Sequence, residues 1–327
     1  MENTGQEAIS GGEQDPSPAP LPASSSPRVG VVLVTHNRPH LMRKALASIV
    51  GQDYAGPITV VVVHDKCQLD TSLIRDDPWR EIKVAENSRT PGLAGARNTG
   101  ICSLDTEFTA FCDDDDSWLP QKLTRQMAAL TAAPTAEFAS TAMVVDYGDR
   151  SAVRLAGAST VSHEDLLRSR MSMVHSSSFL FRRNTLLDGI GLVDETIPNS
   201  MCEDWDLLLR ASRRHSIVHV DQPLIRVLWG GSSYFYGQWG VKNVAHLWML
   251  EHHHEILTSR VGAGRVFGQL AFGHAALGQR RLALGWAARS LRANWREPRA
   301  LLALAVASRL VSDGLVVDQL QRRGRGI

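Results

Sequence analysis

Residues 108–118 read FTAFCDDDDSW, a mostly apolar stretch followed by four consecutive aspartates, a serine and a tryptophan. Residues 108–112 predict a buried strand, and the aspartates follow at its carboxyl end, where open α/β sheets gather their ligand sites. Four neighbouring carboxylates repel one another, so this position favours a bound cation over a solvated acidic loop. We therefore predict a site for a divalent metal that holds a diphosphate.

Two valine-rich strands precede this run. Residues 28–38 form a predicted strand that ends in Thr-His-Asn-Arg, and residues 58–65 form a second that ends in His-Asp. Apolar residues lie on both faces of each strand, which is typical of central strands covered by helices on both sides. The polar ends of these strands are candidates for the same ligand site.

Helical spacing of apolar residues predicts helices at 39–50, 93–104 and 203–214, with another that starts at Pro120. Alternating strands and helices imply parallel pairing with right-handed crossovers. We therefore predict a layered α/β fold with a mostly parallel sheet. Further short strands are predicted at residues 82–85, 138–145, 177–181 and 217–220.

The C-terminal part, from residue 236 to residue 327, is predicted to be a separate helical region rich in Ala, Leu and Arg. Within it, residues 267–298 weakly resemble one tetratricopeptide unit, which is not stable alone and so should pack on the α/β domain. Residues 299–318 are interrupted by Arg309 and Asp313, which argues against a membrane span. An amphipathic or buried helix is expected there, with a peripheral membrane contact as the alternative.

Composition sets further limits on the 327-residue chain. Residues 1–27 are rich in Ser, Pro, Gly and Glu, lack Lys and Arg, and predict a disordered tail. The 35 basic and 34 acidic residues give a net charge of +1, so we expect no nucleic-acid partner. Four isolated cysteines and an N-terminus without a secretory signal predict reduced thiols and a cytoplasmic protein, with membrane association as a variant of that prediction.

Two more segments carry candidate functional groups. Residues 92–101, GLAGARNTGI, predict a helix start with small residues that allow close approach, and a helix N-terminus favours an anion. Glu203 and Asp204 open the later helix. Acidic residues in a first helical turn also occur for capping alone, so this pair gains meaning only from the order of the other motifs.

Taken together, these segments resemble a family 2 glycosyltransferase over residues 28–230. The resemblance implies a GT-A fold at residues 28–235, with a Rossmann-like, mostly parallel mixed sheet flanked by helices. It also implies inverting transfer of a sugar from a nucleoside-diphosphate sugar to an acceptor hydroxyl. The acceptor, whether a glycan, a glycolipid or a small metabolite, is not indicated by any pattern in the sequence.

The resemblance also assigns roles to the residues that bind the donor. Asp65 would accept a hydrogen bond from the nucleotide base, and Thr35 and Asn37 would line the same pocket. Arg97 would reach toward the phosphates or the donor sugar. His64 stands where many members of the family have a second aspartate, which leaves the identity of the base open.

The acidic run contains the Asp-x-Asp pattern twice, as Asp113 with Asp115 and as Asp114 with Asp116. Its spacing to Trp118 favours Asp113 and Asp115 as the family pair, with Asp115 closest to the metal. Asp113 and Asp114 are also predicted to contact the nucleotide. Oxygen ligands suit Mg²⁺ or Mn²⁺ held jointly by carboxylates and phosphates.

Asp204 matches the family's general base, which takes the acceptor proton, and Glu203 would orient it or bind the acceptor. His175 and Ser176–Ser178 are expected near the acceptor side without assigned roles. Residues 229–233, WGGSS, predict a flexible segment that closes over the diphosphate.

Two other functions are considered. A sugar-phosphate nucleotidyltransferase would carry a Gly-rich, basic loop after its first strand, whereas residues 35–39 read THNRP. A degenerate transferase that acts as an interaction scaffold would not need carboxylates at every expected position. Both are less favoured than a metal-dependent glycosyltransferase.

Overall fold

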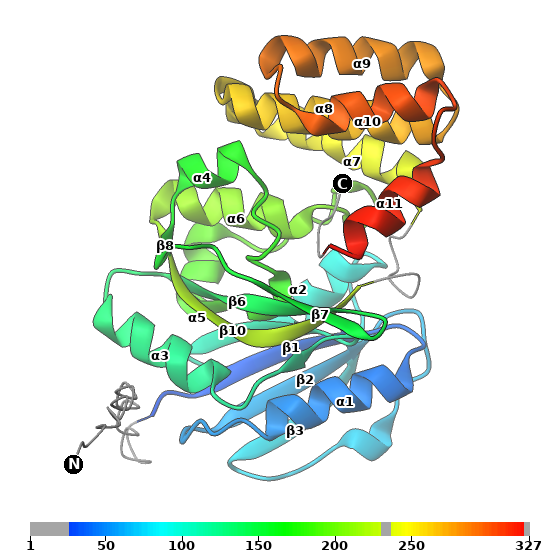
Figure 1. The fold of residues 1–327 in the computed structure, drawn as a ribbon. Helices are drawn as coiled ribbons and strands as arrows, with labels where there is room; N and C mark the ends of the chain where they lie inside the picture. Colours follow the sequence, from blue (N-terminus) through cyan, green and yellow to red (C-terminus); the bar gives the residue numbers. More distant parts are fainter. Residues whose placement is uncertain (1–25, 230–236, 324–327) are drawn as a thin grey trace, which may run out of the picture.

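The structure is a computed structural model that describes residues 26–229 and 237–323 (Figure 1). Within these ranges, ten strands form one sheet in the order β3-β2-β1-β4-β9-β6-β10-β5, with β7 beside β6 and β8 beside β10. The first four strands in this order are parallel to one another. They are β1 (Val29–Thr35), β2 (Ile58–His64), β3 (Arg80–Glu86) and β4 (Phe108–Asp113).

The other half of the sheet is mixed. Strand β9 (Leu180–Arg182) runs antiparallel to both β4 and β6 (Phe138–Tyr147), and β10 (Ile217–Trp229) runs parallel to β6. The predicted sheet flanked by helices, with a helical C-terminal region, is confirmed. The short strands are β5 (Ser117–Trp118), β7 (Arg150–Arg154) and β8 (Thr160–Val161).

Both faces of the sheet are covered, because alternate residues of each central strand point to opposite sides. In β1, Val32 and Val34 belong to one apolar core, whereas Val31 and Leu33 belong to the other. Helices α2 (Leu93–Ser103) and α6 (Glu203–Arg214) cover the first face, and α1 (Pro39–Val50) and α3 (Lys122–Ala132) cover the second.

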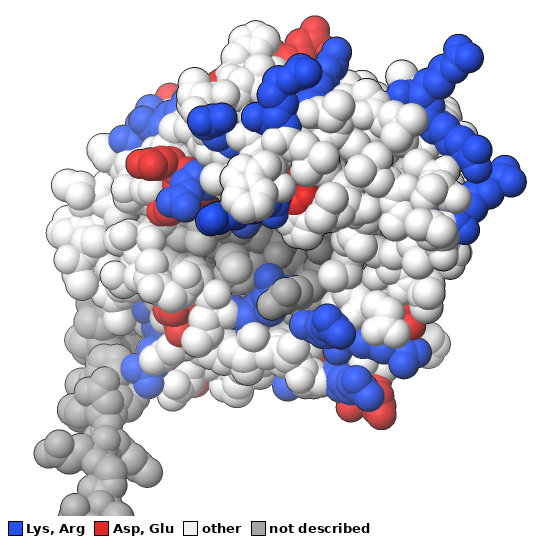
Figure 2. Space-filling model, turned by 45° about the horizontal axis from the view of Figure 1, so that its top comes forward, with Lys and Arg blue, Asp and Glu red and all other residues white. Residues whose placement is uncertain are grey.

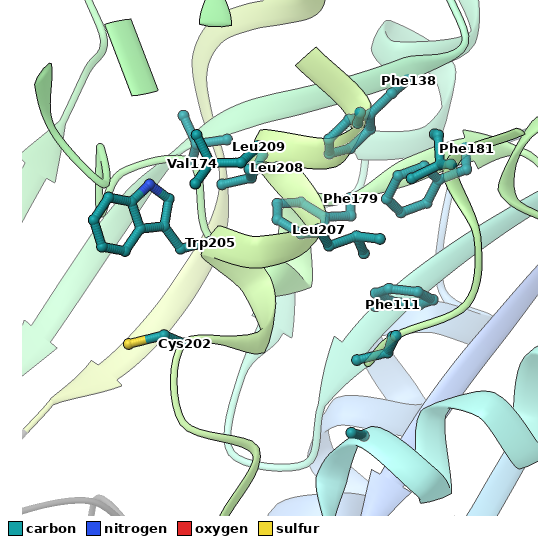
Figure 3. Close-up of a cluster of buried hydrophobic side chains, with 14 of the residues drawn as sticks. Phe111, Phe138, Val174, Phe179, Phe181, Cys202, Trp205, Leu207, Leu208 and Leu209 are labelled. Atoms are coloured by element: carbon teal, nitrogen blue, oxygen red, sulfur yellow. The ribbon is translucent and has the colours of Figure 1, made fainter. Parts of the chain in front are cut away.

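The first core holds α6 in place. Figure 3 shows four phenylalanines from the sheet side beside the leucines of α6. Phe138 stacks on Phe181 with ring centroids 4.1 Å apart, and Phe111 lies 5.5 Å from Phe181. Aromatic groups bury large areas and favour such offset and tilted contacts. The start of α6, with its two acidic residues, is thereby fixed relative to β4.

Five further helices follow the sheet domain and form an end of the molecule above the sheet in Figure 1. Helices α7 and α8 share the first core through residues such as Met249 and Leu270, whereas α8 to α11 form an alanine-rich core of their own. This confirms that the C-terminal region packs on the α/β domain. The five are α7 (Trp239–His252), α8 (Arg260–Ala276), α9 (Arg280–Ala293), α10 (Pro298–Ala307) and α11 (Asp313–Gln321).

The predicted strand at residues 177–181 is partly wrong. Ser176–Ser178 form a 3₁₀ turn because the His175 side chain accepts from the Ser177 amide, and the strand starts only at Leu180. The segment 299–318 is two helices, α10 and α11, separated by Arg309 in a left-handed conformation. Residues 1–25 and 230–236 lie outside the described residues, which leaves the disordered tail and most of the flexible segment as predictions.

None of the helices in residues 26–229 and 237–323 is both long and apolar enough to cross a membrane. The shorter helical elements include α4 (His163–Arg168) and α5 (Arg183–Thr185). Helix α4 packs against α6 and α8, and so connects the two regions.

Candidate active site

A cavity of about 580 Å³ lies where the carboxyl ends of β1, β2 and β4 meet the starts of α2 and α6. Figure 2 shows a face of the molecule that is hollowed, with Lys and Arg side chains around the hollow. Helix α7 adds one residue to the wall, Lys242. The predicted site residues in the wall are Asp65, Asp113, Asp114, Asp115, Glu203 and Asp204.

Asp65 occupies the end of β2 and is held from two sides. Its Oδ1 accepts hydrogen bonds from the Asn87 side chain at 2.7 Å and from the Gly92 amide at 3.1 Å. The carboxylate therefore caps the start of α2, a favourable place for a negative charge, and also faces the cavity. Capping and binding of a ligand group are compatible at this position, because a carboxylate accepts more than two hydrogen bonds.

The corner after β1 differs from the prediction. Thr35 is buried and donates its hydroxyl to Asp114 at 2.9 Å, while Asn37 is exposed with φ at 53°. Among the described residues, the cavity wall is formed at this corner by Val34, His36 and Arg38 and not by Thr35 or Asn37. Arg38 takes the N-cap position of α1. Contact of Thr35 and Asn37 with a nucleotide stays a prediction.

Arg38 binds two residues of the acidic run. Its guanidinium forms an ion pair with Asp114 and another with Asp115 at 2.7 Å. Asp114 is almost fully buried, and burial raises its pKa to about 6, although the positive charge of Arg38 acts in the opposite direction. Arg38 directly follows the Thr-His-Asn corner, so the sequence contained a positional signal for it.

The acidic run meets a histidine from the segment that precedes β9. One ligand atom each of Asp113, Asp116 and His175 lie within 4.8 Å of one another. Ser176 donates to Asp113 at 2.9 Å and Ser177 to Asp116 at 2.5 Å, which fixes both carboxylates. Carboxylate oxygens are the ligands that Mg²⁺ and Mn²⁺ prefer, whereas the imidazole nitrogen of His175 is a ligand more typical of transition metals than of Mg²⁺. The residues present therefore fit a divalent metal, and Asp115 lies beside them in the cavity wall.

Arg97 does not reach into the cavity. Its side chain is only 2% exposed, and its guanidinium bridges Asp113 at 2.6 Å and Glu203. Burial alone would raise the pKa of Asp113, but Arg97 outweighs this and holds that pKa below its ordinary value. Arg97 thus joins the end of β4 to the start of α6, and its contact with a donor stays a prediction.

Glu203 and Asp204 both face the cavity, but in different electrostatic surroundings. Burial, with the negative charge of Asp204, raises the pKa of Glu203 to about 7 despite the nearby Arg97. Burial also acts against ionisation of Asp204, but Arg170, which donates to it at 2.5 Å, holds the pKa of Asp204 below its ordinary value. Asp204 is therefore the more readily ionised member of the pair.

Two cations in the wall were not predicted from the sequence. Arg170 comes from the loop after α4, and Lys242 comes from α7 in the C-terminal region. Among the described residues, Lys242 forms no ion pair, and burial together with the charge of Arg170 lowers its pKa. Neither lies in a recognisable motif, so only the fold reveals them.

The backbone around the cavity is unusual. Seven described residues other than glycine have positive φ. Six of them line the cavity or are next to residues that do: Asn37, Lys66, Met171, Asn199, Ser200 and Cys202. Such conformations cost roughly 1–3 kcal/mol each and concentrate at functional sites. Backbone geometry therefore marks the same cavity as the carboxylates do.

Part of the chain matches a known protein family. The family model described as "Glycosyl transferase family 2" matches residues 30–189, the segment that contains β1, β2, α2 and the acidic run. Residues 30–189 are a glycosyl transferase family 2 segment. Members of this family with the same fold commonly use a divalent metal, which agrees with the donor set around Asp113.

Curated relatives of this chain include a β-1,3-glucosyltransferase of Escherichia coli, WfgD, named as transferring from UDP-Glc to α-D-GlcNAc-diphosphoundecaprenol. It is 28% identical over 102 residues, which cover 31% of this chain and 40% of WfgD. A Campylobacter jejuni β-1,3-glucosyltransferase, named for the acceptor GalNAc(5)-diNAcBac-PP-undecaprenol, is 32% identical over 106 residues, which cover 31% of this chain and 34% of that protein. The aligned part thus spans less than half of these relatives.

Solved structures extend the likeness in fold to the C-terminal region. Residues 1–349 of S. aureus TarS in complex with UDP-GlcNAc superpose with a TM-score of 0.56 at 17% identity, covering 91% of this chain and 92% of that one. The same protein with UDP gives a TM-score of 0.55 at 18% identity. The predicted GT-A fold is confirmed, including a helical region after the sheet domain.

Proposed function

We propose that this protein transfers a sugar from a nucleoside-diphosphate sugar to an acceptor hydroxyl, with inversion at the anomeric carbon. One observation carries the proposal. A single cavity gathers Asp65, the acidic run and Glu203–Asp204, although these groups are separated by up to 139 residues in the chain. A base-binding carboxylate, a diphosphate site and a general base are the three elements that such a transfer needs.

The donor we propose is a UDP-sugar. The E. coli relative is named for UDP-Glc, and TarS was solved with UDP-GlcNAc. In this chain Asp65 would accept a hydrogen bond from the base, with Val34 and His36 beside it in the wall. Asp113 and Asp115 would lie at the ribose and the diphosphate.

The acceptor we propose is a sugar on a lipid diphosphate. Both curated glucosyltransferases named above act on undecaprenol-linked acceptors. On the Asp204 side of the cavity, Arg170 and Lys242 place two cations in the wall. Cations of this kind suit the phosphates of such an acceptor.

In the proposed reaction the acceptor hydroxyl gives its proton to the Asp204 carboxylate as its oxygen forms a bond to the anomeric carbon. The bond from that carbon to the diphosphate breaks on the opposite face, and the nucleoside diphosphate leaves with the electron pair. Arg170 orients Asp204, and Glu203, held by Arg97, lines the acceptor side. A divalent metal held by Asp113, Asp115 and neighbouring groups would stabilise the negative charge of the leaving group.

Nucleotide binding and transfer are separable tests. Thermal shift with UDP, GDP and their sugars, each with Mn²⁺ and with chelator, should show a metal-dependent shift for the uridine ligands that Asp115→Ala removes. Failure of every nucleotide to shift the wild-type protein would contradict the proposal and favour the scaffold alternative.

Transfer is tested with Asp204→Asn, which keeps the shape of the side chain. Loss of a general base lowers the rate by about 10²–10⁴-fold. The nucleotide shift should be retained, because Asp204 lies on the acceptor side. Asp146→Asn is the control, since Asp146 is paired with Arg226 outside the cavity wall. Transfer by Asp204→Asn at the wild-type rate would show that another group is the base.

A further inference from the structure

The seventh residue with positive φ lies far in the sequence from the residues of the cavity wall. Arg309 has φ at 62° and follows the end of α10. The helix ends there in a Schellman motif, in which the Leu310 amide donates to Ala305 at 3.0 Å and the Arg309 amide to Val306 at 2.9 Å. The left-handed position in this motif usually belongs to glycine, because a side chain there is strained.

The same chain ends α8 with the same motif and uses glycine. The Gln279 amide donates to His274 at 2.9 Å and the Gly278 amide to Ala275 at 3.0 Å, with φ of Gly278 at 72°. Two equivalent helix ends therefore differ in one respect, which is that α10 carries an arginine where α8 carries glycine. A residue held in a strained backbone conformation, where nothing nearby offsets the strain, indicates a function at that position.

The next residue, Leu310, is also unusual for a Schellman motif. In a Schellman motif the residue after the left-handed position commonly packs on the helix, yet Leu310 is 79% exposed. At the other end of α10, Trp295 is 72% exposed, and between them Leu301 is 58% exposed on the outer side of the helix. Three large apolar side chains thus lie exposed along α10 and the two loops that flank it.

Exposed arginines lie near these apolar groups in the chain. Arg292, Arg296 and Arg309 are exposed, and none of them forms an ion pair with a residue that the structure describes. The Arg296 guanidinium lies 4.7 Å from the centroid of the Trp295 ring. We call Arg292, Trp295, Arg296, Leu301, Arg309 and Leu310 the α10 surface. Figure 1 shows α9 and α10 at the end of the molecule away from the sheet.

The charge of this part of the chain is strongly asymmetric. Residues 260–327 contain 12 arginines, no lysine and three acidic residues, although the whole chain has a net charge of only +1. All three acidic residues have partners, since Glu297 pairs with Arg299, Asp313 accepts from Trp239, and Asp318 accepts from Tyr147. The positive charge of the region is therefore not neutralised within it.

We propose that the α10 surface binds the anionic surface of a lipid bilayer. Arginines supply attraction to acidic headgroups, and Trp and Leu supply apolar groups that enter the headgroup boundary, the combination typical of interfacial helices. This inference does not rest on the proposed transfer reaction, although a lipid-linked acceptor would be reached from such a position.

Two features favour a bilayer over other occupants. Nucleic acid would use the arginines but would leave Leu301 and Leu310 exposed to water. A second copy of the chain would bring equally charged surfaces together, because the same arginines would face one another in a two-fold interface. A bilayer matches both the charge and the scattered apolar side chains.

Vesicle sedimentation of the full chain tests the proposal. Wild-type protein should bind vesicles of phosphatidylglycerol with phosphatidylcholine and should bind pure phosphatidylcholine much less. Arg292→Gln, Arg296→Gln and Arg309→Gln together should weaken binding by about 10²-fold, because each arginine near an anionic surface contributes about fivefold. Trp295→Ala with Leu310→Ala should weaken the binding that persists at high salt.

A matched control removes equal charge elsewhere. Lys44→Gln, Lys83→Gln and Arg150→Gln together neutralise three exposed cations on the sheet domain and should change binding less than threefold. Equal losses in the two triple variants would contradict a localised surface. Wild-type protein that ignores anionic vesicles would also contradict the proposal, whether it binds nucleic acid or dimerises through Trp295 instead.

These outcomes are independent of catalysis. Vesicle binding is measured without donor or acceptor, so its absence would leave the proposed transfer untouched. Conversely, loss of transfer in Asp204→Asn should leave vesicle binding unchanged, since Asp204 is buried in the cavity wall.

Discussion

The cavity and the α10 surface both depend on arginine, but they use it in opposite ways. Around the cavity, Arg38, Arg97 and Arg170 each pair with carboxylates, and Arg97 is almost fully buried between two of them. On the α10 surface, Arg296 and Arg309 are exposed and have no acidic partner among the described residues. Buried pairs fix geometry, whereas exposed unpaired charges leave free energy available for a partner.

Breaking a buried pair gives the largest expected effect. Arg97→Met keeps most of the volume but leaves Asp113 and Glu203 without a counter-ion, which should lower the free energy of unfolding by about 3–5 kcal/mol. Chemical denaturation measures the loss. The matched control is Arg75→Met, because Arg75 is exposed and pairs only with Asp77. It should change stability by less than about 0.5 kcal/mol, and an equal effect of both changes would contradict the comparison.

Lys122 is a third case beside the paired and the exposed arginines, because it is buried without a carboxylate partner among the described residues. Its ammonium group has no hydrogen-bond partner among the described residues and lies 3.8 Å from the centroid of the Trp118 ring. Burial lowers its pKa to about 7, and its neighbour Cys112 remains a neutral thiol because burial raises that pKa. Lys122→Met should therefore stabilise the protein at pH 6 to 7 by about 1–3 kcal/mol. This net value already includes the loss of the contact between Lys122 and the Trp118 ring.

The same lysine predicts a pH dependence. Between about pH 7 and pH 10, the unfolded chain keeps the Lys122 proton that the folded chain has released, so wild-type stability should rise with pH relative to Lys122→Met. Below pH 7 Lys122 is protonated in both the folded and the unfolded chain. The difference in stability between the wild type and Lys122→Met should therefore become constant. Denaturation curves of the two proteins at pH 6 and pH 9 provide the test. Parallel pH profiles would show that Lys122 titrates normally in the fold.

The smallest expected effect concerns the end of α10. Arg309→Gly relieves the left-handed strain and should stabilise the protein by about 0.5–1 kcal/mol, while it weakens binding to anionic vesicles. Gly278→Arg places the same strain at the end of α8 and should destabilise by a similar amount. Thermal unfolding compares the two. A loss of stability in Arg309→Gly would mean that its side chain stabilises the helix end.

Much of the site could be predicted from the sequence because its groups follow directly after strands. Asp65 and the acidic run lie at the ends of β2 and β4, and Glu203–Asp204 begin α6 at the predicted residue. Since the carboxyl ends of parallel strands meet at one edge of a sheet, position in the chain was enough to place Asp65 and the acidic run together, whereas Glu203–Asp204 gained their meaning from the order of the motifs.

Other side chains have partners that the sequence pattern does not indicate. Arg97 lies buried between the carboxylates of Asp113 and Glu203 and does not line the cavity, and its contact with a donor stays a prediction. His253 lies between two exposed histidines but is itself only 2% exposed, and it bonds Asp206 at 2.9 Å. That contact joins residues 47 positions apart, and helical spacing alone gives no sign of it.

The sequence by itself determined the layered fold, the edge of the sheet that carries the site and the acidic groups within it, because strand period and strand ends are local properties of the chain. Only the tertiary structure decided which charges are paired, that Arg170 and Lys242 enter the same cavity, and that the apolar side chains of the α10 surface remain exposed. These features depend on contacts between residues far apart in the chain, and such contacts exist only once the sheet domain and the helices have packed together.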